Sequence, residues 1–232
     1  MAPRKSRPDV PTFACINKAR MEPGVDFDRL IPALQVFLDD CFVPIWGTPA
    51  RLVKATKPQP GAWTMAFFDT PDDPSAEGYH DILKNGLPLA KVFIKPTLDN
   101  KDKVSVTACH ELCETLVDPN INLWSVGPRG VFWAYEVCDA VEEEEFLVDG
   151  VSMSDFVFPA YFEAFRKPNS TQFDYLKKVT RPFHLLKGGY SEVRHGRRSK
   201  DVFGSRDKQR RFAKEDRRFH RNELRRHRTR TP

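Results

Sequence analysis

The chain has 232 residues, a net charge of +5 at pH 7 and an apolar fraction of 40%. This length suits one domain with appendages and is enough to bury a core. No run of eighteen apolar residues occurs, and the first residues, Met-Ala-Pro-Arg-Lys-Ser-Arg-Pro, lack the apolar segment of a secretory signal. We therefore expect no membrane partner and synthesis in the cytoplasm.

Positive charge is concentrated near the C-terminus. Residues 194–232 contain 16 Lys and Arg against 5 Asp and Glu, a net charge of +11, whereas residues 1–193 carry −6. This segment has too few large apolar residues to fold alone. Its cations could bind the phosphates of DNA, lie on an acidic protein surface, or only keep the chain in solution. We therefore predict a basic, proline-rich N-terminal arm at residues 1–20, a domain at residues 21–193 and a basic tail at residues 194–232.

The apolar pattern predicts a helix followed by strands. Apolar residues from Phe27 to Phe42 recur at i, i+3, i+4 and i+7, which indicates a long amphipathic helix. It should start near residue 28 or 29, so that Pro32 falls in its first turn, and end at Pro44. Strands are predicted at residues 51–55, 62–68, 79–83 and 87–94, the last two joined by a tight turn at Asn85-Gly86. Residues 95–103 read as a loop.

A second helix is predicted at residues 104–117, ended by Asp118-Pro119. A strand and a loop follow at residues 130–139, and a hairpin at residues 146–153 turns at Asp149-Gly150. Residues 206–227 could form a basic helix. The order indicates an α+β fold with a mixed sheet.

The second helix carries the sequence Val-Thr-Ala-Cys-His-Glu-Leu-Cys-Glu-Thr-Leu-Val-Asp-Pro at residues 106–119. Four residues apart on a helix, His110 and Glu114 project from one face and can bind one metal ion. Glu111 takes the place of the general base in the H-E-x-x-H zinc proteases, and Glu114 replaces the second histidine as an oxygen ligand of zinc. The alternative is an exposed helix face with ordinary solvated side chains.

A catalytic zinc needs three protein ligands and one open position. The best third candidate is Glu136; Asp139 is its rival, or a carboxylate that orients a ligand from behind. Glu111 would then accept a proton from the attacking water and pass it to the leaving amine. A strand beside the helix would hold the peptide through main-chain hydrogen bonds.

Other residues have two interpretations. His80 is a substrate contact, a ligand or a structural residue near a hairpin. The five cysteines include no C-x-x-C pair, which excludes a zinc ribbon or a disulfide framework and favours reduced, buried thiols. Cys109 and Cys113 could form a thiolate clip, but they align with the apolar face of the helix, so we expect them in the core.

Several segments together resemble a zincin-like family found largely in tailed-bacteriophage genomes. They are the motif at residues 105–119, Tyr79-His80-Asp81, Gly86–Phe93, Glu136-Val-Cys-Asp139, Val157-Phe-Pro-Ala-Tyr-Phe162 and Gly188-Gly-Tyr190. The matches span about residues 60–190, and their joint order is more specific than H-E-x-x-E alone.

The resemblance implies a zincin-like fold, in which a long helix backs a mixed sheet and the motif helix lies beneath it. It also implies a virion-associated protein that works beside other virion proteins in a larger assembly. A carboxylate in place of an imidazole lowers the charge on zinc and weakens its power to acidify water. The alternative is therefore an inactive, structural or connector-associated virion protein whose basic tail binds DNA or neighbouring subunits.

Overall fold

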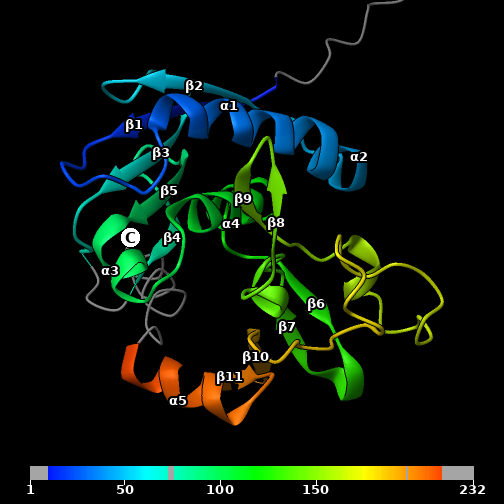
Figure 1. Cartoon of the computed structure of the whole chain (residues 1–232). Helices are drawn as coiled ribbons and strands as arrows, with labels where there is room; N and C mark the ends of the chain where they lie inside the picture. Colours follow the sequence, from blue (N-terminus) through cyan, green and yellow to red (C-terminus); the bar gives the residue numbers. More distant parts are fainter. Residues whose placement is uncertain (1–9, 73–75, 197, 216–232) are drawn as a thin grey trace, which may run out of the picture.

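The computed structural model describes residues 10–72, 76–196 and 198–215 (Figure 1). Its largest sheet has five strands in the order β2-β1-β3-β5-β4, of which β4 is antiparallel to β5 and all other neighbours are parallel. The strands are β1 (Thr12–Asn17), β2 (Arg51–Ala55), β3 (Trp63–Phe68), β4 (Gly78–Ile82) and β5 (Pro88–Phe93). The mixed sheet and the α+β class agree with the prediction from sequence.

The first strand corrects the predicted domain boundary. Residues 12–17 were assigned to the N-terminal arm, yet β1 lies between β2 and β3. Its residues Phe13 to Ile16 are buried on both faces of the sheet, because a central parallel strand is covered on both sides. The folded domain therefore begins near residue 12; residues 1–9 of the predicted arm lie outside the described residues.

The first helix is longer than predicted. It consists of α1 (Phe27–Phe37), a π-helical turn at Leu38–Phe42 and α2 (Val43–Trp46). The side chain of Asp26 caps it by accepting a hydrogen bond from the backbone N–H of Asp28 at 2.9 Å. Pro44 does not end it, because this proline occupies the first turn of α2; Gly47, at φ 69°, ends it instead.

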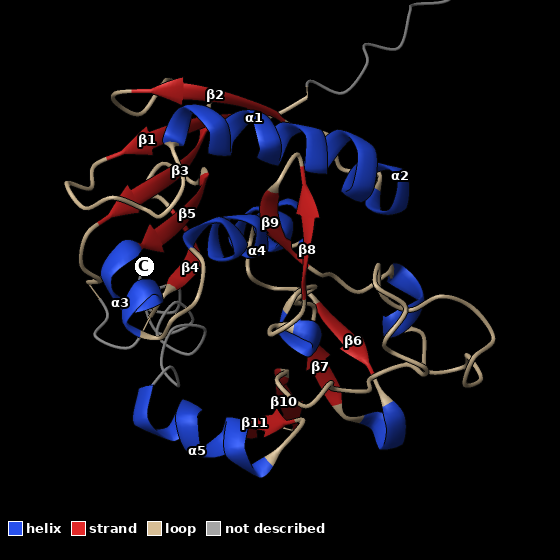
Figure 2. Cartoon of the chain, viewed as in Figure 1, coloured by secondary structure: helices blue, strands red, loops and turns tan. Residues whose placement is uncertain are grey.

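Two helices precede the second half of the chain. The predicted loop at residues 95–103 contains a short helix, α3 (Ile94–Asp99), where Pro96 is tolerated because it lies in the first turn. The motif helix, α4 (Val104–Val117), has the predicted bounds. Both α1 and α4 pack on the sheet face that carries Phe13, Met65 and Val92 (Figure 2), so one core joins them.

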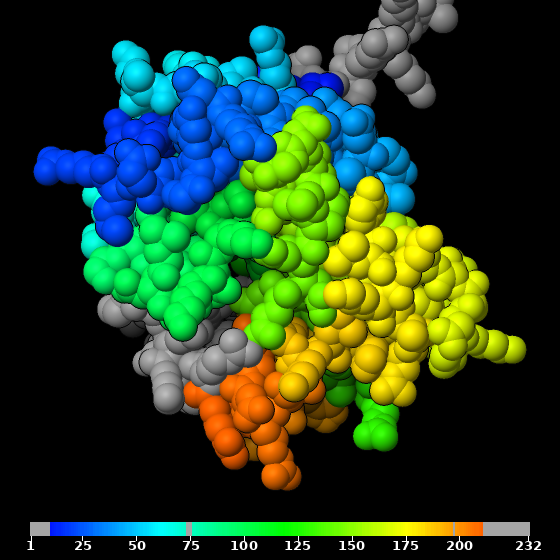
Figure 3. Space-filling view, in the orientation of Figure 1, coloured from blue at the N-terminus to red at the C-terminus, as the bar shows by residue number. Residues whose placement is uncertain are grey.

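The rest of the chain forms two smaller sheets. The hairpin β8 (Glu145–Val148) and β9 (Val151–Ser154) has the predicted turn, with positive φ at Asp149 and Gly150. Figure 3 shows this hairpin, in yellow-green, between the N-terminal helix in blue and the yellow segment around residue 170. A four-stranded antiparallel sheet has the order β11-β10-β7-β6; it contains β6 (Trp124–Val126), β7 (Phe132–Ala134), β10 (Tyr190–His195) and β11 (Arg198–Phe203). Short 3-10 helices occupy Pro128–Gly130, Asp139–Val141 and Pro159–Phe162.

The predicted tail also contributes to the folded part. Strand β11 pairs with β10 along its whole length, and α5 (Arg206–Glu215) follows it. The predicted basic helix at residues 206–227 is described only to residue 215, and residues 216–232 lie outside the described part. Among the helices of the described residues, none is long and apolar enough to cross a membrane.

Candidate metal centre

The motif residues of α4 are buried rather than solvated. Glu111 and Glu114 are 5% and 4% exposed, and the side chain of His110 is 12% exposed. Helical spacing brings His110 and Glu114 together, with 3.3 Å between His110 Nε2 and Glu114 Oε1. Two buried carboxylates on one helix turn need compensation by cations, so this is not an ordinary polar helix face.

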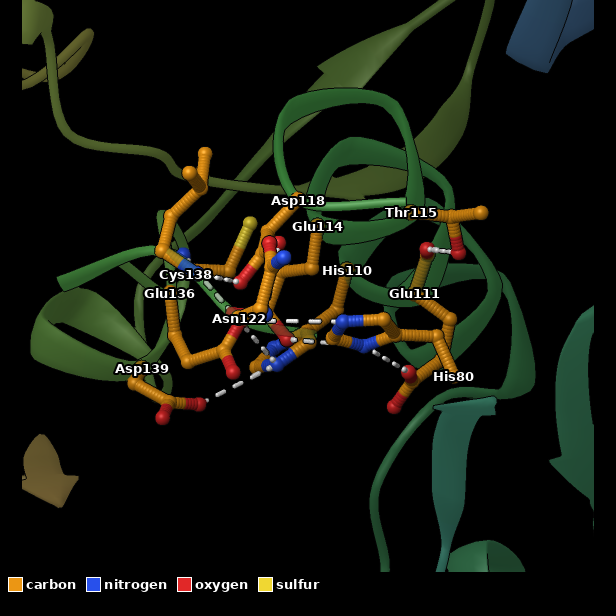
Figure 4. Close-up of polar contacts among 11 residues, drawn as sticks. His80, His110, Glu111, Glu114, Thr115, Asp118, Asn122, Glu136, Cys138 and Asp139 are labelled. Atoms are coloured by element: carbon orange, nitrogen blue, oxygen red, sulfur yellow. Dashed lines mark hydrogen bonds and ion pairs between the residues drawn. The ribbon is translucent and has the colours of Figure 1, made fainter. Parts of the chain in front are cut away.

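Asp139, at the start of a 3-10 helix, completes the surroundings of His110 (Figure 4). Its Oδ1 lies 3.3 Å from His110 Nε2. Burial alone would lower the pKa of His110, but the charge of Glu114 and the hydrogen bonds with Asp139 and Glu114 outweigh it, so this pKa lies well above its usual value. The imidazole is therefore held between two acidic side chains.

The pKa values of the two acids, Glu114 and Asp139, shift in opposite directions although both side chains are buried. Burial tends to raise the pKa of Glu114, but the charge and hydrogen bond of His110 lower it below its usual value. The backbone N–H of Cys138 also donates to Glu114 Oε1 at 3.2 Å. Burial and the charge of Glu114 raise the pKa of Asp139 to about 7, against the hydrogen bond of His110. Glu114 is thus the more firmly ionised of the pair.

His80 enters the same site from strand β4. Its Nδ1 lies 3.7 Å from Glu111 Oε2 and 3.8 Å from Glu114 Oε2, and its Nε2 lies 3.8 Å from Glu136 Oε2. The side chain is 7% exposed. Of the roles left open for this histidine, the structure supports a place at the centre of the site.

Gly78 lets α4 approach β4 closely. A Cβ at this position would lie 2.7 Å from Glu111 Oε1 and 2.8 Å from the Cγ2 of Thr107. Only glycine leaves room for Glu111 beside the strand.

Two groups of side chains present donor atoms within 4.8 Å of one another: His110, Glu114 and Cys138, and His80, Glu111 and Glu114. Buried Glu111 Oε2 and His80 Nε2 make no hydrogen bond within the described residues. Imidazole, carboxylate and thiolate are the donors that zinc prefers. The donor set and the buried atoms without hydrogen bonds fit a divalent cation.

The predicted residues all reach this region, with one difference in arrangement. His110, Glu111, Glu114 and Asp139 lie together around α4, whereas Glu136 faces His80 and Cys138 stands near His110 and Glu114. All five cysteines are buried and reduced, and Cys113 hydrogen-bonds Cys109 and Cys138. The pair Cys109 and Cys113 therefore belongs to the core, as expected.

Cys138 was not predicted from the sequence as a metal donor. The signal was the segment Glu136–Asp139, in which a third donor stands between the two acids already considered. Comparison with protein-family models, curated proteins and solved structures gives no match for this chain.

Proposed function

We propose that this protein is a zinc-dependent hydrolase that cleaves peptide bonds, with His110 and Glu114 as ligands and Glu111 as general base. The observation that carries the proposal is the burial of both acids on one turn of α4, against two imidazoles. Such an arrangement is costly for stability unless the site binds a cation.

The third ligand in this proposal is Cys138, because its sulfur belongs to the donor group of His110 and Glu114. Glu136 was the candidate from sequence, but it faces His80. Asp139 Oδ1 lies 3.3 Å from His110 Nε2, the same nitrogen that faces Glu114, so Asp139 stands on the ligand side of this imidazole as a rival ligand. Zinc affinity distinguishes Cys138 from Glu136 as the third ligand. Cys138→Ser should weaken zinc binding at least tenfold, and Glu136→Gln should weaken it by less. If Glu136→Gln has the larger effect, Glu136 is the third ligand.

A bound zinc polarises the scissile carbonyl and acidifies water. Glu111 accepts the proton of the attacking water and passes it to the leaving amine. His80 Nδ1 lies 3.7 Å from Glu111 Oε2 and places an imidazole beside the proposed base. Burial of Glu111 keeps bulk water away from the proton being moved.

Strand β4 supports a polypeptide as substrate. It is the outer strand of the five-stranded sheet as described, and it contacts α4. An extended peptide could pair with its free edge by main-chain hydrogen bonds, which would bring a scissile bond beside His80 and Glu111.

Zinc content and hydrolysis test the proposal. Protein purified without chelators should carry at least one zinc per chain, and His110→Ala should lose zinc and the hydrolysis of fluorescently labelled casein. His195→Gln, which changes an exposed histidine, is the control. A wild-type protein without stoichiometric zinc would refute the enzyme proposal.

A second candidate function rests on the C-terminal part. Its described cations include Arg194, whose guanidinium lies 4.8 Å from the ring centre of Trp124 and 5.4 Å from that of Phe132. Aromatic rings with a cation beside them can also serve as stacking platforms for nucleic-acid bases. We propose that residues 194–232 bind DNA or neighbouring subunits in a virion, where the resemblance to phage sequences suggests that this protein works.

Salt dependence tests the second candidate. The full chain should bind duplex DNA with an affinity that falls steeply as salt rises, and a chain ending at residue 215, which keeps α5, should show a smaller slope. Equal slopes would remove DNA as a partner of residues 216–232.

A further inference from the structure

The two oxygens of Glu114 face different imidazoles. Oε1 lies 3.3 Å from His110 Nε2, and Oε2 lies 3.8 Å from His80 Nδ1. The two histidines come from separate elements, α4 and β4, so the carboxylate stands between two sets of donors. A carboxylate placed in this way can bridge two cations.

The second set is complete without Cys138 or Asp139. His80, Glu111 and Glu114 each offer an atom within 4.8 Å of the others, and all three residues are more than nine-tenths buried. Glu111 Oε2 has no hydrogen-bond donor among the described residues. A buried carboxylate oxygen aimed at an imidazole without a hydrogen bond indicates a missing ligand.

Charge also favours a second cation. Four acids, Glu111, Glu114, Glu136 and Asp139, form ion pairs with the two imidazoles of this site. With both histidines neutral and Cys138 bound as a thiolate, as metal ligands must be, these groups carry a charge of −5; one divalent ion leaves −3, and two leave −1.

We propose a second divalent-cation site formed by His80, Glu111 and Glu114, which shares Glu114 with the first. This inference rests on the proposed function, because a cation bound to Glu111 occupies the oxygen that accepts the proton. Filling the second site therefore inhibits hydrolysis, and the local concentration of the metal regulates the enzyme.

The second site also explains why the motif has Glu114 where H-E-x-x-H has a second histidine. A glutamate at position 114 offers two oxygens to two ions, whereas a neutral histidine offers only one free lone pair. Glu114→His restores the common motif and should therefore abolish the second site while the first remains.

Zinc titration of the full chain tests the proposal. Elemental analysis after equilibrium dialysis should find two zinc ions per wild-type chain and one in His80→Gln and in Glu114→His. His195→Gln should keep two. Casein hydrolysis by the wild type should fall at least tenfold between one and two equivalents of zinc. In His80→Gln, the rates at one and at two equivalents should be nearly equal.

The outcomes separate the two proposals. A wild type that saturates at one zinc, or a His80→Gln variant that still binds two, overturns the second site but leaves the zinc hydrolase standing. A wild type that binds no zinc overturns both. Circular dichroism of each variant confirms that it is folded.

Discussion

At the scale of a single residue, Glu111 is the position at which the proposed metal binding and the proposed chemistry can be tested separately. Replacing it with glutamine removes the proton acceptor but leaves His110, Glu114 and Cys138 unchanged. We expect Glu111→Gln to lower casein hydrolysis by about 10²- to 10⁴-fold and to keep one zinc per chain. Glu22→Gln, at an exposed position, is the matched control. If Glu111→Gln hydrolyses casein at the wild-type rate, another group must be the general base.

Asp155 is a buried acid outside the candidate metal centre, and its protonation makes the stability of the protein depend on pH. Asp155 is fully buried beside Asp174, and burial together with the charge and hydrogen bond of Asp174 raises the pKa of Asp155 to about 8. Its Oδ1 accepts hydrogen bonds from the backbone N–H groups of Phe156 and Leu176.

A raised pKa of an acid means that the folded protein holds a proton which the unfolded chain releases. Stability from this group is therefore present at low pH and is lost as pH rises from about 4 to about 8, by up to about 1.4 kcal/mol per pH unit. Asp155→Asn keeps the shape and removes the titration. Urea unfolding at pH 5, 7 and 9 should show that the variant gains stability relative to wild type at each higher pH. A stability difference that stays the same at all three pH values would contradict the raised pKa of Asp155.

The site shows which residues a sequence can reveal. His110, Glu111 and Glu114 follow from helical spacing, because neighbours on a helix face are fixed by local geometry. His80 is 30 residues before His110 and reaches the site only because β4 pairs with β5 and packs on α4. No local pattern encodes that approach, so the sequence left the role of His80 open.

At the scale of elements, the contact between β4 and α4 depends on Gly78. Adding a methyl group there forces Glu111 and Thr107 away from the strand. We expect Gly78→Ala to lower the free energy of unfolding by about 1–3 kcal/mol and to weaken zinc binding, measured by urea unfolding and dialysis. Thr107→Ser removes the Cγ2 methyl, so the double variant should recover part of the loss. No recovery would show that the strain lies elsewhere.

The elements that the sequence predicted well have strong local signals. The α4 bounds and the β8–β9 turn follow from apolar periodicity and Asp149-Gly150. The α3 helix was missed because Pro96 reads as a breaker unless the helix start is known. Strand β1 was missed because a central strand leaves only a short apolar run, Phe13 to Ile16, after a basic, proline-rich segment.

At the scale of the whole molecule, helix α5 of the basic C-terminal part contacts the acidic domain through an ion pair that is largely shielded from solvent. Lys208 of α5 contacts Glu142, with side chains 9% and 18% exposed, and its ammonium lies 5.7 Å from the ring centre of Tyr190. In the same acidic run, Glu144 forms an ion pair with Lys178 and Glu145 forms one with Lys103.

Lys208→Ala should therefore destabilise the whole domain by about 1–3 kcal/mol, since it leaves Glu142 partly buried without this partner. Lys200→Ala, which removes an exposed lysine from β11, should change stability by less than about 0.5 kcal/mol. Urea unfolding measures both. Equal effects would mean that α5 does not dock through this pair.

The central position of β1 has a consequence for the order of folding during synthesis. Residues 12–17 are made first, but their partners β2 and β3 end only at residues 55 and 68. At translation rates of about 5–20 residues per second, this strand waits roughly 3–10 s for its neighbours. During that time an apolar segment without strand partners is exposed to other nascent chains. We therefore expect the protein to depend on chaperones early in synthesis, before its candidate metal centre can form.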